Sequence, residues 1–342
     1  MYLFFVAWWI VDLTKDQGLK WVISVLMLFA ILIFVGLRYE VGGDWGDYLM
    51  WYKKIELEGA TQFEPGYNFL NKYSAILGGG IYLVNIAGLM IIIICFWKSA
   101  KILNLSIPVF CLLIFPHYIL IVTMGYSRQA IAISITFYAF TQLLINRRKW
   151  YFLLLIVVAM LFHYAAFSAC AMLLIVRNIM SVKMVLVTIL ITFFSFHYNA
   201  DKLEPLLKYY IDPDSKMVSH GAIFRVGIWT SILCMVIVFK SKLSFILRYG
   251  INWRSMLFGY IICMILLIFG VMSTLVDRVL LYFYLIPYLG LSNIFSNIRN
   301  NTAVYGIAVW STVLFSIIIT MVWLGYALHR DGWVPYKNII WY

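Results

Sequence analysis

Apolar segments of roughly membrane-spanning length, most of them without a charged residue, recur along almost the whole chain, and this feature limits the folds open to it. A helix needs about 20 mostly apolar residues to cross the hydrocarbon core of a bilayer, with a range of roughly 17–25. Runs of about this kind cover residues 21–37, 80–97, 102–122, 126–145, 150–176, 184–198, 222–239, 255–275, 279–296 and 302–325. With a short first span over residues 1–13, the sequence predicts an all-α, polytopic transmembrane bundle of about 11–12 spans.

The composition agrees with burial in lipid. Of the 342 residues, 64% are hydrophobic and 12% are charged, whereas a soluble domain has roughly 45–50% apolar and about 25% charged residues. No polar stretch is long enough to form a separate soluble domain, so we expect residues 1–342 to form a single membrane domain. The first 13 residues lack the basic start and the cleavage site of a signal peptide, and we expect them to be retained.

Several functional classes are disfavoured by the same sequence. The five cysteines lie inside apolar runs without zinc-type spacing, so neither a disulfide framework nor a zinc site is expected. The net charge of +12 comes from short loops between apolar runs, which indicates membrane topology and not binding of nucleic acid. P-loop, GxGxxG and HExxH motifs are missing, so we expect no cofactor and no metal; acidic residues leave a divalent cation open as an alternative.

Basic residues cluster at alternate ends of the apolar runs, and these ends are expected to face the cytoplasm. The opposite, outer side then receives two long loops, 38–79 and 199–220, and the tail 326–342. The loops carry aromatic residues, which indicates that they fold onto the membrane domain.

The segment 150–176 is flanked by basic residues on both sides but is too short for two full spans. We expect two short helices that meet near His163, so that both ends face the cytoplasm. Short broken helices are tolerated where protein or an aqueous cavity covers the break. The alternative is one long tilted span that places Arg177 on the outer side.

The first outer loop opens with a dense group of charged residues and glycines. Arg38 stands at the membrane boundary, and glycines between 42 and 46 permit tight turns and close approach of a ligand to the backbone. If residues 44–48 are helical, Asp44 and Asp47 share a face. The loop predicts either a base or cation site for a charged substrate, or a solvated turn with a snorkelling arginine.

Other arginines lie where apolar runs meet the outer side. Arginine at membrane depth costs about 2.5–3.5 kcal/mol on insertion scales and often marks a functional site. Arg128 and Arg225 lie at the start of two runs, and Asp277 and Arg278 adjoin a third as a possible ion pair. Because guanidinium groups match phosphate oxygens bidentately, arginines on one face predict binding of an anionic lipid headgroup such as a diphosphate.

His163 is the only histidine centred in an uncharged stretch of this length. A neutral imidazole can act as a general base near pH 7, although a hydrogen-bonded core histidine is the alternative. Aromatic residues such as Tyr48 could stack on sugar rings or form an interfacial belt. Trp333 and Tyr336 in the tail allow the same two interpretations.

The stretch from Gly36 to Tyr52, with the pattern Arg-Tyr-x-Val-Gly-x-Asp-x-x-x-Tyr, resembles the first long loop of the EpsG-type group of Wzy polysaccharide polymerases. Further segments follow in the usual order of that family: Glu64-Pro65-Gly66-Tyr67, Ser127-Arg128-Gln129-Ala130, the His163 region, Asp277-Arg278 and Trp333-x-Pro335-Tyr336. The resemblance covers nearly the whole chain.

This resemblance implies an enzyme of the bacterial inner membrane. It would join oligosaccharide repeat units linked to undecaprenyl diphosphate at the periplasmic face, with one lipid-linked chain as donor and a sugar hydroxyl of another as acceptor. The lipid diphosphate would leave. The implied partners are the two lipid-linked oligosaccharides, the bilayer, a flippase and a chain-length regulator.

Residue roles follow as expectations. Catalysis is assigned to Arg128 with a base, either His163 or Asp44. The expected substrate-binding residues are Arg38, Arg128, Arg225, Arg278, Asp47, Asp277, Tyr48 and Glu64. Two other functions stay open: a membrane glycosyltransferase that uses a polyprenyl-phosphate sugar, and a non-enzymatic flippase or transporter, which should show internal symmetry.

Overall fold

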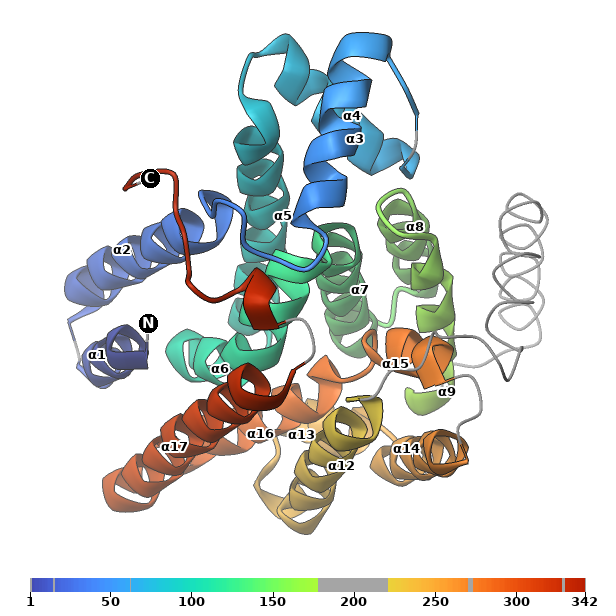
Figure 1. The fold of residues 1–342 in the computed structure, drawn as a ribbon. Coiled ribbons are helices and arrows are strands. Elements are labelled where there is room, and N and C mark those ends of the chain that lie inside the picture. The colour runs from blue at the N-terminus through green and yellow to red at the C-terminus, as the bar shows by residue number, and fades with distance from the viewer. Residues whose placement is uncertain are drawn as a thin grey trace. The chain divides into compact units, whose positions relative to one another are not determined.

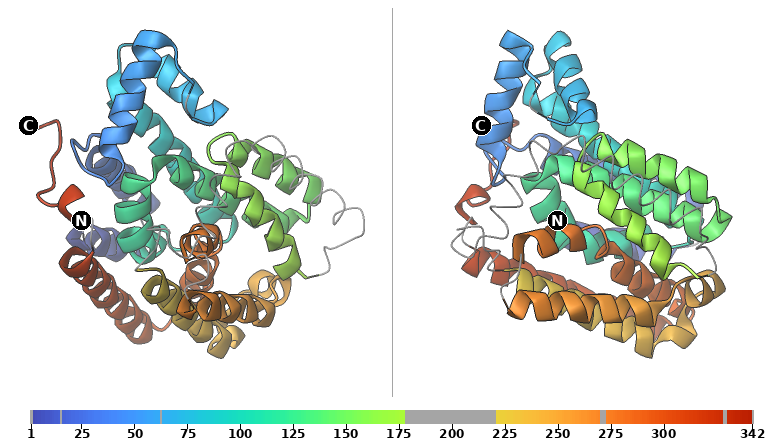
Figure 2. Two further views of the ribbon diagram at one scale, coloured as in Figure 1. Left: turned by 45° about the vertical axis from the view of Figure 1, so that its right-hand side comes forward. Right: turned by 90° about the vertical axis from the view of Figure 1, so that its right-hand side faces the viewer.

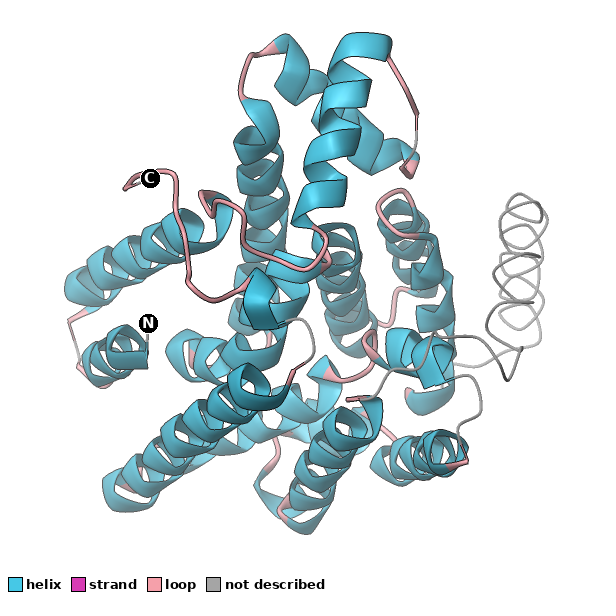
Figure 3. Ribbon diagram, in the orientation of Figure 1, coloured by secondary structure: helices cyan, strands magenta, loops and turns pink. Residues whose placement is uncertain are grey.

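The computed structural model describes residues 2–14, 16–61, 63–177, 221–269, 273–327 and 330–341. Every regular element in these ranges is helical, and two isolated β-bridges, Arg38–Asn338 and Val176–Ile251, are the only sheet-type pairings there (Figure 3). The predicted all-α fold is confirmed. The predicted 184–198 span and the 199–220 loop lie outside the described residues.

The chain forms two compact units. Unit 1 comprises Met1–Tyr138, Leu161–His163 and Ile298–Tyr342, and unit 2 comprises Ala139–Met160 and Tyr164–Asn297. The expectation of one membrane domain is not tested by this division and stays a prediction. Helix α7 (Ser127–Asn146) begins in unit 1 and ends in unit 2.

Unit 1 is built from these helices: α1 (Tyr2–Asp12), α2 (Gln17–Gly36), α3 (Trp45–Glu58), α4 (Pro65–Ile76), α5 (Gly80–Ile102), α6 (Ile107–Ile114), η1 (Phe115–Thr123), α17 (Thr302–Tyr326) and η4 (Arg330–Gly332). Aromatic rings join two of them to the first part of α7, because Phe96 of α5 and Phe110 of α6 both pack on Phe137, with ring centroids 5.5 and 5.6 Å away. Pro116 lacks the N–H that an α-helix needs, and the chain there winds into the wider π-helical turns of η1.

In the described part of unit 2 the helices are α8 (Lys149–Met160), η2 (Tyr164–Ala171), α9 (Met172–Ile175), α12 (Ala222–Val238), η3 (Lys240–Lys242), α13 (Phe245–Gly250), α14 (Trp253–Ile268), α15 (Ser273–Leu280) and α16 (Leu285–Ile298). Side-chain capping starts α14, since Asn252 accepts a hydrogen bond from the Ser255 N–H at 3.4 Å. Trp253 then packs in the core, where its ring nitrogen donates to the Leu247 carbonyl at 3.0 Å.

The helices match the predicted membrane spans. Among the described residues, four segments are long and apolar enough to cross a bilayer: Gly80–Ile102, Ser127–Asn146, Ser273–Ile298 and Thr302–Tyr326. Six shorter apolar helices, of 10–17 residues, coincide with other predicted runs. The chain is therefore a polytopic helical membrane protein.

The segment 149–175 is a helical hairpin, as predicted. Helix α8 ends at Met160, and η2 begins at Tyr164 after a break at 161–163. Figure 2 shows α8 and η2 side by side, and the two pack together. Arg147 Nη1 donates to the Arg177 carbonyl at 3.0 Å, so the two ends of the segment meet. A single tilted span would separate those ends by the thickness of the membrane.

Cysteine labelling can test this hairpin in cells. We expect Arg148→Cys and Arg177→Cys, each in a cysteine-free variant that still makes polymer, to resist a membrane-impermeant maleimide until the cells are permeabilised. Both residues are exposed at the ends of the hairpin. Leu57→Cys, on the first long loop, serves as the control that labels in intact cells. Labelling of the 177 site alone in intact cells would show one continuous span.

The first long loop folds into two packed helices. Helix α3 ends at Gly59, which adopts the left-handed conformation that glycine allows (φ 66°). Pro65 occupies the first turn of α4, where its missing N–H costs nothing. The helices α3 and α4 pack on each other and on α5 (Figure 1). The expectation that this loop folds onto the membrane domain is confirmed.

Candidate functional site

An ion pair joins the start of α7 to the start of α4. Arg128 Nη1 lies 2.6 Å from Glu64 Oε2, and the side chains are 29% and 7% exposed. The guanidinium carbon also lies 4.7 Å from the ring centroid of Phe63 and 5.9 Å from that of Tyr48. Glu64 and the two rings therefore fix the orientation of Arg128. Its Nε is buried and makes no hydrogen bond to the described residues, and an unpaired buried donor favours a polar ligand.

Arg38 is 2% exposed, and its donors are directed at the protein. Its Nε and Nη1 donate to the carbonyls of Val41 and Val35 at 3.1 and 2.8 Å. Its Nη2 donates to Ser127 Oγ at 3.0 Å and to Asn85 Oδ1 at 3.3 Å. Burial lowers the pKa of Arg38 to about 10, which still leaves it charged near pH 7.

The observed role of Arg38 is thus to tie the end of α2 to α5 and to Ser127, the residue before Arg128. A direct contact between Arg38 and a diphosphate stays a prediction. The sequence did not single out Asn85 as its partner, although a polar side chain within the apolar run 80–97 was an available signal.

Arg38→Lys should destabilise the protein even though it keeps the charge. A lysine ammonium cannot reproduce the planar fork that reaches four acceptors on three segments. Unsatisfied buried carbonyl, hydroxyl and amide groups should cost about 2–4 kcal/mol in total. The thermal midpoint of the purified protein in detergent should fall clearly below that of wild type, and polymer should decrease with it. An unchanged midpoint would contradict this bridging role.

Two tyrosines lie beside the arginines. The ring centroids of Tyr48 and Tyr67 are 5.6 Å apart, and the two residues are 6% and 1% exposed. Burial raises the pKa of both phenols, so both keep their protons at neutral pH and can donate hydrogen bonds. The Tyr67 hydroxyl has no hydrogen-bond partner among the described residues. A buried hydroxyl of this kind favours a polar ligand, because an unpaired one is costly.

The tip of the hairpin reaches the same region. The Gly66 N–H donates to the Leu161 carbonyl at 2.7 Å, and a Cβ at Gly66 would lie 2.8 Å from that oxygen. A glycine is therefore needed where α4 meets the tip. The contact brings the half-buried His163, two residues beyond Leu161, to the part of the molecule that holds Glu64.

The predicted acidic residues of the first loop lie at the start of α3. Asp44 precedes the helix and is half-buried, whereas Asp47 in the first turn is exposed. Residues 45–48 are helical, as the shared-face argument for these two carboxylates required. Among the described residues no three His, Cys, Asp or Glu side chains come together as metal ligands do. The expectation of a metal-free site stays a prediction.

The segment 330–341 holds the loop 37–43 in place. The Gly42 N–H donates to the Gly332 carbonyl at 2.8 Å, and the Tyr336 hydroxyl donates to the Phe34 carbonyl at 2.5 Å. Trp333 is 6% exposed, and its ring nitrogen donates to the Leu120 carbonyl at 3.0 Å. Trp333 was expected to contact sugar or the membrane interface. That expectation is wrong, because its ring is buried against protein beside Gly43.

A second ion pair lies in unit 2. Arg225 binds Asp277 bidentately, with Nη2 2.5 Å from Oδ2 and Nε 3.2 Å from Oδ1. The sequence indicated a neighbouring Asp277–Arg278 pair and did not indicate Arg225 as a partner. Arg278 is exposed on α15. For these three residues a role in substrate binding stays a prediction.

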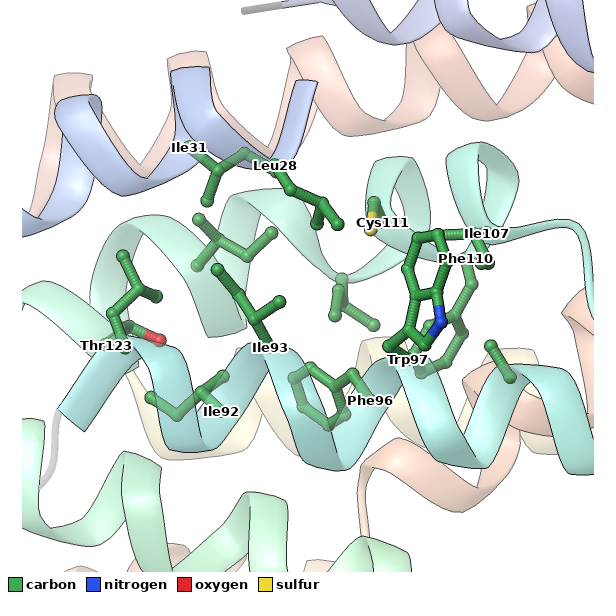
Figure 4. A pocket seen from close by; sticks show the side chains of 14 residues that line it. Leu28, Ile31, Ile92, Ile93, Phe96, Trp97, Ile107, Phe110, Cys111 and Thr123 are labelled. Atoms are coloured by element: carbon green, nitrogen blue, oxygen red, sulfur yellow. The ribbon is translucent and has the colours of Figure 1, made fainter. Parts of the chain in front are cut away.

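An apolar cavity in unit 1 is too small for a sugar or a phosphate. It has a volume of about 40 Å³ and lies among residues of α2, α5, α6 and η1, including Leu28, Phe96 and Cys111 (Figure 4). Its few polar atoms include the Thr123 hydroxyl, which already donates to the Tyr118 carbonyl at 2.9 Å. The region around Arg38 and Arg128 is therefore the stronger candidate for binding a polar substrate.

The fold and these residues define a polytopic membrane protein with a partly buried arginine–glutamate pair at the folded first loop. The chain matches the sequence model of the EpsG family over residues 21–338, and it belongs to that family. Membership supports a role of the polysaccharide-polymerase type. Neither the curated proteins nor the solved structures yielded a match.

Proposed function

We propose that this protein polymerises oligosaccharide repeat units carried on undecaprenyl diphosphate at the periplasmic face of the bacterial inner membrane. The observation that carries this proposal is the geometry of Arg128, which Glu64 holds at 2.6 Å while the side chain is 29% exposed and its buried Nε has no partner among the described residues. Such a fixed cation suits a substrate whose charge is concentrated in a diphosphate.

The reaction transfers a glycosyl group between two lipid-linked molecules. A hydroxyl oxygen on the acceptor sugar attacks the anomeric carbon of the donor and forms the new glycosidic bond. The bond from that carbon to the diphosphate oxygen breaks, and its electron pair leaves with the lipid diphosphate. The hydroxyl proton passes to a base on the enzyme, so the step needs neither an oxidant nor a nucleotide.

Arg128 would stabilise the negative charge that develops on the leaving diphosphate. A preorganised donor of this kind acts most strongly where charge appears in the transition state. Tyr48 and Tyr67 would add neutral hydrogen-bond donors beside it, because their buried phenols stay protonated. Arg38 would act indirectly by fixing Ser127. A role of Arg225 or Arg278 in substrate binding rests on the sequence alone.

His163 is the proposed base, with Asp44 as the alternative. The half-buried imidazole lies at the hairpin tip, which contacts α4 beside Glu64 through the Gly66–Leu161 hydrogen bond. His163→Ala should lower the polymerisation rate by about 10²–10⁴-fold if the imidazole removes the proton. Full activity in His163→Ala, with loss in Asp44→Asn, would transfer the role to Asp44.

A gel of surface polysaccharide from a deletion strain tests the proposed function. We expect the polymer ladder to disappear while material with one repeat unit remains, and the wild-type gene to restore the ladder. Loss of all surface material, with repeat units trapped on the cytoplasmic side, would instead indicate a flippase. A complete ladder that lacks a single sugar branch would indicate a transferase that uses a polyprenyl-phosphate sugar.

A further inference from the structure

Helix α4 has its polarity reversed relative to a helix that packs against a core in water. The side facing the protein carries Tyr67, Asn71 and Ser74, all buried. The opposite side carries Phe69 and Tyr73, which are 56% and 51% exposed. Ile76 and the following Leu77 extend this side and are 68% and 71% exposed. A helix at an aqueous surface normally buries its apolar stripe and exposes its polar one.

Contacts on the buried side fix this orientation. Asn71 Nδ2 donates to the Tyr67 carbonyl at 2.7 Å within the helix, whereas Ser74 Oγ donates to the Gly80 carbonyl at 2.5 Å and ties α4 to the start of α5. Rotating the helix to bury Phe69 would break the Ser74 bond and move the Tyr67 ring away from Tyr48. The apolar side is thus held outward by the contacts that also position the candidate site.

The exposed side has the composition of a membrane interface. Phe69 and Tyr73 lie with their ring centroids 4.2 Å apart, and Lys72 is exposed between them on the same stripe. Aromatic rings and a lysine that can extend its ammonium toward phosphate groups are typical of the headgroup region. A cluster of large apolar side chains exposed to water would be unusual in a folded loop.

This side also lies next to a membrane-spanning helix in the chain. Leu77 is followed by a short turn in which Gly78 and Gly80 have φ values of +66° and +61°. The turn leads directly into α5, a segment long and apolar enough to span a bilayer. Helix α4 also packs on α5 (Figure 1), so it stays next to this span after the turn.

We propose that α4 lies in the interface of the bilayer, with Phe69, Tyr73, Ile76 and Leu77 in contact with lipid and Lys72 directed toward lipid phosphates. The occupant of this surface is the bilayer itself. The contact does not depend on the activity proposed above, but one consequence rests on it. Because Glu64 precedes α4, the Glu64–Arg128 pair would lie at the depth of lipid headgroups, where a lipid-linked diphosphate also lies.

Spin labels can measure this contact directly. Single cysteines at Phe69, Tyr73 and Ile76 would be labelled in a cysteine-free variant and reconstituted into vesicles of phosphatidylethanolamine and phosphatidylglycerol. We expect the ratio of oxygen to nickel-chelate accessibility at these three sites to be several-fold above that at Lys53→Cys, an exposed control on α3. Nickel accessibility equal to the control would overturn the proposal. Spin–spin broadening that disappears on dilution with unlabelled protein would also overturn it, since a second copy would then cover the surface.

A charge substitution adds a functional readout. Tyr73→Glu should reduce the polymer ladder several-fold because a carboxylate opposes insertion, whereas Tyr73→Trp should retain the wild-type ladder. Equal ladders for the two variants would count against the lipid contact. The spin-label result needs no activity, so it separates the two proposals. Lipid exposure at the three sites, combined with a deletion strain that keeps its ladder, would overturn the proposed polymerase and leave the membrane contact standing.

Discussion

Arg128→Ala should lower polymerisation by about a hundredfold or more while single repeat units still reach the lipid carrier. A rate loss of this size is expected when an enzyme loses one charged group that stabilises the leaving group in a site shielded from water. Arg128→Lys should recover only part of the rate. The single ammonium of lysine can bind Glu64, but it cannot at the same time replace the second donor that the Nε of Arg128 provides. The ladder on a gel and the turnover of a lipid-linked substrate by purified protein measure the effect.

Two further variants make this result specific. Arg254→Ala removes an exposed arginine on α14 and should leave the ladder intact, which excludes a general effect of lost positive charge. Glu64→Gln should lower the rate about tenfold or more by loosening Arg128. If Glu64 acts through Arg128, the variant Glu64→Gln/Arg128→Ala should be no worse than Arg128→Ala alone. Wild-type polymer in Arg128→Ala would end the proposed role.

Gly42→Ala should be the most destabilising conservative substitution in the first loop. Gly42 has φ +119°, which side chains rarely tolerate, and a Cβ would lie 2.2 Å from the Met124 carbonyl oxygen. Backbone strain and steric overlap together should cost about 2–5 kcal/mol. Because the Gly42 N–H also binds the Gly332 carbonyl, the loop should detach from the 330–341 segment. A large fall in thermal midpoint and loss of the ladder are expected.

Gly46 provides the matched control in the same loop. It lies in helix α3, and a Cβ there would meet nothing within 4 Å. Gly46→Ala should therefore fold as well as wild type or slightly better, since alanine favours a helix by roughly 0.5–1 kcal/mol. If Gly42→Ala had the same midpoint as Gly46→Ala, the close approach of Gly42 to Met124 would be refuted.

The membrane helices could be predicted from the sequence because each depends on local information. An uncharged run of sufficient length satisfies its own backbone hydrogen bonds as a helix, whatever its neighbours are. The hairpin at 149–175 was also predictable, since basic residues on both flanks indicated ends on the same side. Glycines in the first loop were recognised as permitting close approach, but Gly42 approaches the protein backbone at Met124 and not a ligand.

The pairing of charged residues was not predictable, because it depends on how distant helices pack. Arg128 and Glu64 are 64 positions apart, Arg38 and Asn85 are 47 apart, and Arg225 and Asp277 are 52 apart. The position of each residue is set by the segment that carries it. No helical or strand periodicity in the sequence relates one partner to the other. The sequence thus identified most of these charged residues as candidates. Only the fold showed which of them bind one another.

The hydrogen bond between Tyr336 and Phe34 joins positions 302 residues apart and thereby sets an order of events during biosynthesis. The loop that carries Arg38 emerges from the ribosome early. The segment 330–341, whose hydrogen bonds hold this loop, is made only after helix α17. Until that helix has been inserted, Trp333 cannot cover the glycines beneath it. The region that we propose binds the diphosphate would therefore mature only after α17 has been inserted.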